Sequence, residues 1–116
     1  MHNFRKLNIW IEARFLAKEV YLLTSGFPAT EKFGLISQIN RSAISVPSNI
    51  AEGSARSTNK DFAHFLRISL GSLFELETQL ILSTDLEITS EKEVEEIIQR
   101  IIMLQKMISN FIKTLG

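Results

Sequence analysis

Apolar residues recur at alternating steps of three and four along four stretches of the chain. The first two stretches contain Ile9, Ala13, Leu16, Val20, Leu23 and Phe27, and then Ile36, Ile39, Ala43, Val46 and Ile50. The last two contain Phe62, Leu66, Ser69, Leu73, Leu76 and Leu80, and then Val94, Ile97, Ile101, Leu104, Ile108, Phe111 and Leu115. This spacing puts the apolar residues of each stretch on one side of an α-helix. It predicts four amphipathic helices and no strands.

The residues between these stretches predict where the helices begin and end. Gly26-Phe27-Pro28 stops the first helix, and the second begins near Thr30 or Glu31 and ends near Gly53. Thr58 is a candidate N-cap, and Ser90-Glu91-Lys92-Glu93 has the pattern of a capping box. Because the loops are short, we predict an all-α, antiparallel, up-down-up-down four-helix bundle. It occupies residues 1–116 as one domain.

The stretch SVPSNIAEGSAR, residues 45–56, falls in the second predicted helix and contains Pro47. A proline inside a helix removes one hydrogen bond and clashes with the carbonyl four residues earlier, here that of Ala43. The helix either continues with a kink at Pro47 or breaks and restarts with Ser45 as its cap. We favour the kinked second helix, because Val46 and Ile50 keep the apolar stripe in phase across the proline.

On a helical wheel, polar residues of this stretch form a second stripe nearly opposite the apolar one. Glu52 and Arg56 stand at i and i+4, a favourable order for an ion pair. A solvated polar face is one interpretation, but such faces usually carry longer side chains than serine and alanine. We therefore predict that small residues here and in the third helix meet a partner. The oligomer-interface candidates are Ser45, Asn49, Glu52, Arg56, Gly71 and Ser72.

The helices carry more apolar residues than one stripe each requires. The additional residues are Trp10, Phe15, Leu22, Ile68, Leu70, Phe74, Ile81, Leu82, Ile98, Ile102 and Ile112. Either the buried stripes are wide and the protein is a monomer, or part of this surface is covered by another copy. Because large exposed apolar patches are uncommon on soluble monomers, we favour self-association.

Composition restricts the class of protein. The 116 residues contain no cysteine and have a net charge of zero, which excludes disulfides and gives no general attraction to nucleic acid. Residues 1–72 nevertheless contain nine Lys/Arg and five Asp/Glu, so they carry +4 and residues 73–116 carry −4. No apolar run is long enough to cross a membrane and no signal peptide is visible, so we expect a cytoplasmic protein without membrane contacts.

The residues of the first three predicted helices resemble a known family. The resemblance covers about residues 4–86 and is carried most specifically by Asn49-Ile50-Ala51-Glu52-Gly53 and by Gly71-Ser72 followed by Glu75-Leu76-Glu77. Further matching residues are Trp10, Val20, Tyr21, Thr24, Phe27, Pro28, Glu31, Phe33, Gly34, Leu35, Gln38, Arg41, Ser45, Pro47, Arg56, Phe62, Phe65, Leu66, Gln79 and Leu80. The chain thus resembles the four-helix bundle proteins encoded in intervening sequences of bacterial 23S ribosomal RNA genes.

This resemblance implies a four-helix monomer that assembles into a ring-like homopentamer, and the family has no established biochemical role. A related group, the accessory proteins of diversity-generating retroelements, implies a second hypothesis in which the protein binds ribosomal or other structured RNA, or DNA. Arg41, Arg56, Lys60 and Arg67 are the nucleic-acid-binding candidates. Those relatives are strongly basic, whereas this chain is neutral and has Asn40-Arg41 where the family often has two basic residues.

Catalytic and metal-binding patterns are weak. Asp61-Phe62-Ala63-His64 has the carboxylate-x-x-His spacing of a di-iron bundle, but the one other histidine is His2 near the terminus. The acidic run Glu91, Glu93, Glu95 and Glu96 complements the positive end of the fourth helix dipole. We expect no cofactor, no metal site and no enzymatic activity. An enzyme hypothesis would require a metal at Asp61 and His64.

Overall fold

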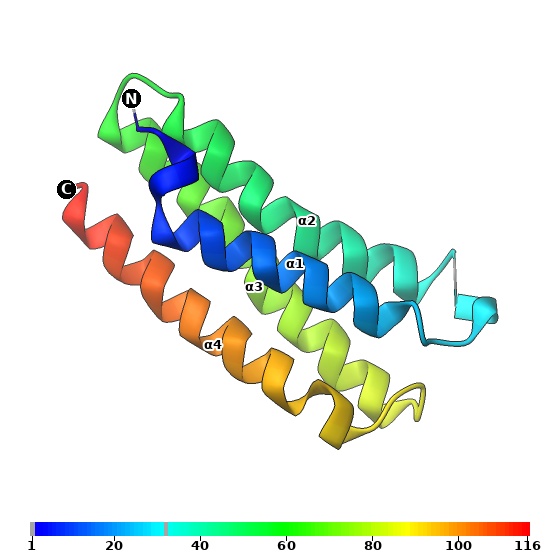
Figure 1. Cartoon of the computed structure of the whole chain (residues 1–116). Coiled ribbons are helices and arrows are strands. Elements are labelled where there is room, and N and C mark those ends of the chain that lie inside the picture. Colours follow the sequence, from blue (N-terminus) through cyan, green and yellow to red (C-terminus); the bar gives the residue numbers. More distant parts are fainter. Residues whose placement is uncertain (1, 32) are drawn as a thin grey trace.

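Four long helices surround one core in the structure, a computed structural model that describes residues 2–31 and 33–116 (Figure 1). They are α1 (Asn8–Thr24), α2 (Leu35–Ser54), α3 (Asn59–Asp85) and α4 (Glu91–Thr114), accompanied by the 3-10 turns η1 (Phe4–Lys6) and η2 (Ala29–Glu31). Each helix packs on the next in the chain, and α4 packs on α1. The described residues contain no strand. The predicted antiparallel all-α bundle is confirmed, with extents of 44 × 23 × 19 Å.

The predicted apolar stripes line the core of the bundle. Every residue of the third stripe, from Phe62 to Leu80, is buried. The other three stripes are also buried apart from four residues near helix ends, which are half-buried: Leu23, Ile36, Phe111 and Leu115. Burying one such side chain stabilises the fold by roughly 1.5–3 kcal/mol, so the stripes supply most of the drive for the helices to pack.

Two helices begin where the sequence predicts. The Thr58 hydroxyl accepts a hydrogen bond from the backbone N–H of Asp61 at 3.1 Å, and α3 starts at the next residue, Asn59. The Ser90 hydroxyl accepts one from the N–H of Glu93 at 3.2 Å, and α4 starts at Glu91. Both side chains satisfy a backbone donor that has no partner within its own helix.

The predicted start of the second helix near Thr30 or Glu31 is wrong, because α2 begins at Leu35. After Pro28 the chain forms the 3-10 turn η2, in which the Glu31 N–H donates to the Pro28 carbonyl at 2.9 Å. Gly34 then precedes α2 with a non-helical backbone (φ −106°, ψ −104°). Glycine has a low helix propensity, so it separates the turn from the helix where the apolar spacing alone did not.

α2 runs without interruption through Pro47, so the alternative in which it breaks and restarts is wrong. The proline leaves the Ala43 carbonyl without its usual helical donor. Two side chains donate to other carbonyls of the same turn. The Ser69 hydroxyl of α3 donates to the Val46 carbonyl, and the Asn49 amide donates to the Ser45 carbonyl, both at 2.9 Å.

Helices α2 and α3 approach each other closely at Gly53. A Cβ atom at this position would lie 2.7 Å from the Cβ of Phe65 and 2.9 Å from Cδ1 of Phe62. The Phe65 Cβ is attached directly to the backbone and cannot rotate away. The glycine is therefore required by the packing of the two helices, even though glycine disfavours a helix.

We predict that Gly53→Ala lowers the free energy of unfolding by about 1–2 kcal/mol, because overpacking outweighs the gain in helix propensity. The matched control is Gly71→Ala in α3, where an added Cβ has no atom within 4 Å. The control should raise stability by up to about 1 kcal/mol. Urea unfolding followed by the fluorescence of Trp10, at the lowest workable concentration, measures both. A neutral or stabilising Gly53→Ala would show that the helices are not in contact here.

Candidate functional site

Three of the predicted interface residues form a polar cluster between α2 and α3. The hydroxyls of Ser45 and Ser72 lie 2.9 Å apart, within hydrogen-bond distance. The side-chain amide of Asn49 donates to the Ser45 hydroxyl at 3.0 Å as well as to the Ser45 carbonyl. All three residues are half-buried. Their polar groups therefore already have partners within the chain.

The helical-wheel prediction that Ser45 and Asn49 point away from the bundle is consequently wrong. α2 packs on α1 through one flank and on α3 through the other, so its buried arc is wider than a single apolar stripe. On the α1 flank, the Thr24 hydroxyl donates to the Asn40 side-chain oxygen at 3.2 Å. On the α3 flank, the corresponding contact is made by Ser45 and Ser72 of the polar cluster.

Glu52 and Arg56 are exposed, as predicted, and pair with each other at 3.1 Å. An exposed i, i+4 pair contributes at most about 0.5 kcal/mol to stability. The Arg56 guanidinium also lies 4.6 Å from the centre of the Phe65 ring, which favours a cation–π contact. These contacts hold Arg56 against the α2–α3 seam.

The apolar residues beyond the four stripes divide into two groups. Trp10, Leu70, Ile98 and Ile112 are half-buried and pack against the core. The others remain exposed: Phe15, Leu22, Ile68, Phe74, Ile81, Leu82 and Ile102. On α1, Phe15 and Leu22 are 54% and 55% exposed, and on α3, Phe74 is 54% exposed. Gly71 lies on the same outer surface of α3 as Phe74 and is open to solvent.

The four basic candidates do not form one surface. Arg41 lies on α2 and Arg56 just beyond its end, fifteen residues later, or roughly 22 Å away at 1.5 Å per residue. Lys60 and Arg67 lie together on α3 and line a shallow depression with Lys113 of α4. The side chain of Asn59 donates to the Leu115 carbonyl at 3.2 Å and so joins α3 to α4 beside this depression.

Lys113 was missed because its position depends on the pairing of two helices distant in sequence. The antiparallel topology puts the end of α4 beside the start of α3. A cation near the C-terminus of the fourth helix could therefore have been assigned to the same surface as Lys60. We call Lys60, Arg67 and Lys113 the basic depression.

Charge is separated along the long axis of the bundle. The end that holds both termini and the α2–α3 connection (Figure 1) comprises residues 2–16, 47–72 and 104–116, with eight Lys/Arg and three Asp/Glu. The described residues of the opposite end, 17–31, 33–46 and 73–103, contain four Lys/Arg and ten Asp/Glu. The formal charges are therefore +5 and −6. The charge separation between the two ends of the bundle is therefore larger than the +4 and −4 found for residues 1–72 and 73–116 of the sequence.

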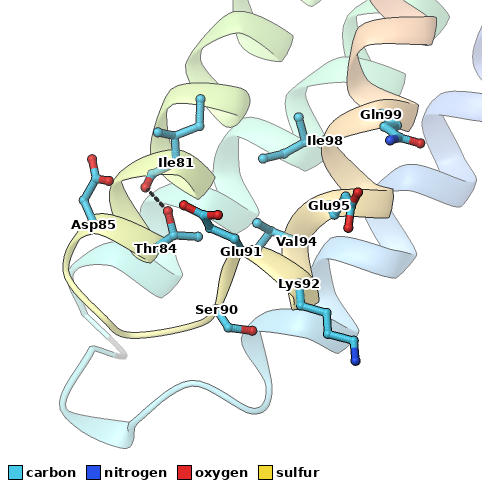
Figure 2. A pocket seen from close by; sticks show the side chains of 10 residues that line it. All are labelled: Ile81, Thr84, Asp85, Ser90, Glu91, Lys92, Val94, Glu95, Ile98 and Gln99. Carbon is cyan, nitrogen blue, oxygen red and sulfur yellow. Dashed lines mark hydrogen bonds between the residues drawn. The ribbon is translucent and has the colours of Figure 1, made fainter.

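A groove at the acidic end lies between the end of α3 and the start of α4 (Figure 2). Ile81 and Ile98 form its apolar walls, and Asp85, Glu91 and Glu95 lie around it. The Thr84 hydroxyl donates to the Ile81 carbonyl at 2.7 Å within α3. The Ser90 hydroxyl beside the groove donates to the Glu93 carboxylate at 3.4 Å, a long, exposed contact within the cap of α4, and we assign no reaction to it.

The Asp61 and His64 pair, which an enzyme hypothesis would require as metal ligands, gains no support from the structure. Asp61 and His64 are both exposed, and the His64 ring lies edge-on to Phe65 with centroids 5.6 Å apart. Within residues 2–31 and 33–116, no three His, Cys, Asp or Glu side chains gather closely enough to hold a metal ion. In the same ranges no helix has the length and apolar character needed to cross a bilayer.

Comparison with known proteins identifies the family. A search of curated proteins found no match. A crystal structure of a protein of unknown function from the S23 ribosomal protein family of Bacteroides thetaiotaomicron has the same fold, with a TM-score of 0.81 and 24% identity over 90% of this chain and 98% of that one. The model of the 23S rRNA-intervening sequence protein family matches residues 5–110. The chain belongs to this family of 23S rRNA-intervening sequence proteins.

Proposed function

We propose that this protein is a non-enzymatic, cofactor-free bundle that functions as a homo-oligomer in the cytoplasm. The apolar side chains exposed on the outer surfaces of α1 and α3 carry the proposal, because such a surface is stabilised when another copy covers it. A ring-like pentamer, implied by the family resemblance, is the form of assembly that we propose. Glu52, Arg56 and Gly71 remain accessible candidates for contacts between copies.

Self-association predicts a mass well above the 13.2 kDa of one chain. Size-exclusion chromatography with light scattering, at tens of micromolar chain, should give about five times that mass. Dilution should shift the mass downward, because association depends on concentration. A sharp monomer peak across the whole concentration range would contradict the proposal.

The basic depression favours a second candidate function, binding of structured RNA or DNA. Lys60, Arg67 and Lys113 converge there from two helices, and the surrounding end of the bundle has a formal charge of +5. Cations grouped in this way bind phosphates by releasing counterions from the nucleic acid. The family name refers to 23S rRNA, which agrees with an RNA partner.

We predict that a labelled RNA hairpin binds at low salt and that its affinity falls steeply as salt rises. Replacing Lys60 and Lys113 with Gln should weaken binding and reduce the slope of log affinity against log salt by about two, one for each phosphate contact. Fluorescence anisotropy measures both quantities.

The matched control for this experiment is Lys92→Gln, which removes an exposed cation from the acidic end. It should leave affinity nearly unchanged. Arg41→Gln tests whether the separate cation on α2 takes part. Affinity that is absent at low salt, or equally reduced by Lys92→Gln, would argue against the basic depression as a nucleic-acid site.

A further inference from the structure

The outer faces of α1 and α3 point in opposite directions from the bundle. Each of these helices packs on both α2 and α4, so α1 and α3 occupy diagonal corners (Figure 1). The α1 outer face consists of Ile11, Phe15 and Leu22, all exposed. The α3 outer face consists of Ile68, Gly71, Phe74 and Leu82, which are also exposed. Neither face has a partner helix within the bundle.

The two faces differ in shape at their centres. Phe15 projects from α1 with more than half of its side chain exposed. Gly71 leaves a gap on α3, since a Cβ atom there would have nothing within 4 Å. An aromatic ring on one helix and a glycine on the other allow two helices to approach closely, whereas two copies of the α1 face would place Phe15 against Phe15.

The charges beside Phe15 are arranged in a definite order. Glu12 and Lys18 lie three residues before and after Phe15, so they are displaced from it by about 60° around α1, in opposite directions. Glu12 lines a small crevice with Arg100 and Met107 of α4, which places it on the α4 side. Lys18 therefore lies on the α2 side.

The charges beside Gly71 have the reverse order. Arg67 and Glu75 lie four residues before and after Gly71, so they are displaced from it by about 40° around α3, in opposite directions. Arg67 lines the basic depression with Lys113 of α4, so it is on the α4 side. Glu75 is on the α2 side, one turn after Ser72, whose hydroxyl lies 2.9 Å from that of Ser45 on α2.

These orders match when two copies stand side by side in the same orientation. α1 and α3 run in the same direction, so the acid of one face meets the cation of the other on each flank: Glu12 with Arg67, and Lys18 with Glu75. The Thr24–Asn40 hydrogen bond fixes the position of α1 relative to α2 along the bundle axis, and the Ser45–Ser72 bond does the same for α2 and α3. Counting residues along each helix from these bonds puts Phe15 and Gly71 within about one helical turn of each other along the axis.

We propose that the α1 outer face of one copy packs on the α3 outer face of the next, with Phe15 seated over Gly71. This inference rests on the proposed self-association and specifies its interface. Because each copy uses two different faces, the contact is heterologous, and repetition closes a ring when the rotation between copies allows it. The ion pairs on both flanks select this pairing over a contact between two α1 faces.

Two variants test the pairing. Phe15→Glu disables the α1 face, and Gly71→Glu fills the gap on the α3 face. Both positions are solvent-exposed, so circular dichroism should show folded helices in each variant. Alone, each variant should be monomeric, with association weakened at least about thirty-fold, as for a central interface residue. Mixed together, they should form a 1:1 heterodimer, because each chain retains the face that the other lacks.

The control is Lys106→Glu on α4, an exposed position that belongs to neither face and does not line the crevice that contains Glu12. It should keep the wild-type mass. If the wild type is oligomeric but both variants keep that mass, or the mixture stays monomeric, the pairing is wrong while self-association stands. If the wild type itself is monomeric, self-association fails as well. Binding of monomers to anionic vesicles through Phe15 would instead make the α1 face a membrane contact and overturn the pairing.

Discussion

The close contact between α2 and α3 determines how the other elements are arranged. Gly53 brings α2 against Phe62 and Phe65, and the Ser45–Ser72 contact sets the two helices at one height. With this pair in place, the antiparallel order of the chain puts α1 and α4 in the two remaining positions around the core. The outer faces of α1 and α3 then point away from each other, which is why the bundle has two opposed surfaces.

This arrangement also explains why the polar stretch around Pro47 differs from an ordinary solvated helix face. Ser45 and Asn49 hydrogen-bond at the contact between α2 and α3, where longer side chains would separate the helices. Small polar residues thus allow α2 to be buried on two flanks, while side chains donate to the Ser45 and Val46 carbonyls beside the proline. Glu52 and Arg56, one or two turns further on, are the part of the stretch that reaches solvent.

The apolar periodicity was sufficient to predict the four helices, the core and the caps at Thr58 and Ser90, because these features depend on residues close together in sequence. It failed at the start of α2, where the turn after Pro28 and Gly34 overrides the apolar spacing. It also failed for Ser45 and Asn49. A helical wheel shows which residues lie opposite the apolar stripe, but it does not show how much of the helix circumference the neighbouring helices cover. Lys113 illustrates the same limit, since only the packing of α4 on α3 places it beside Lys60.

The separation of charge along the bundle has a consequence for how the molecule moves toward other charged bodies. With zero net charge, the chain experiences no overall attraction or repulsion at long range. Opposite charges at the two ends of a 44 Å body nevertheless produce a torque in an external field. Within the screening length of about 8–10 Å from a polyanion, the bundle turns so that the end with both termini and the α2–α3 connection faces the polyanion. Encounters are therefore oriented, with the helix axes pointing at the surface, before any specific contact forms.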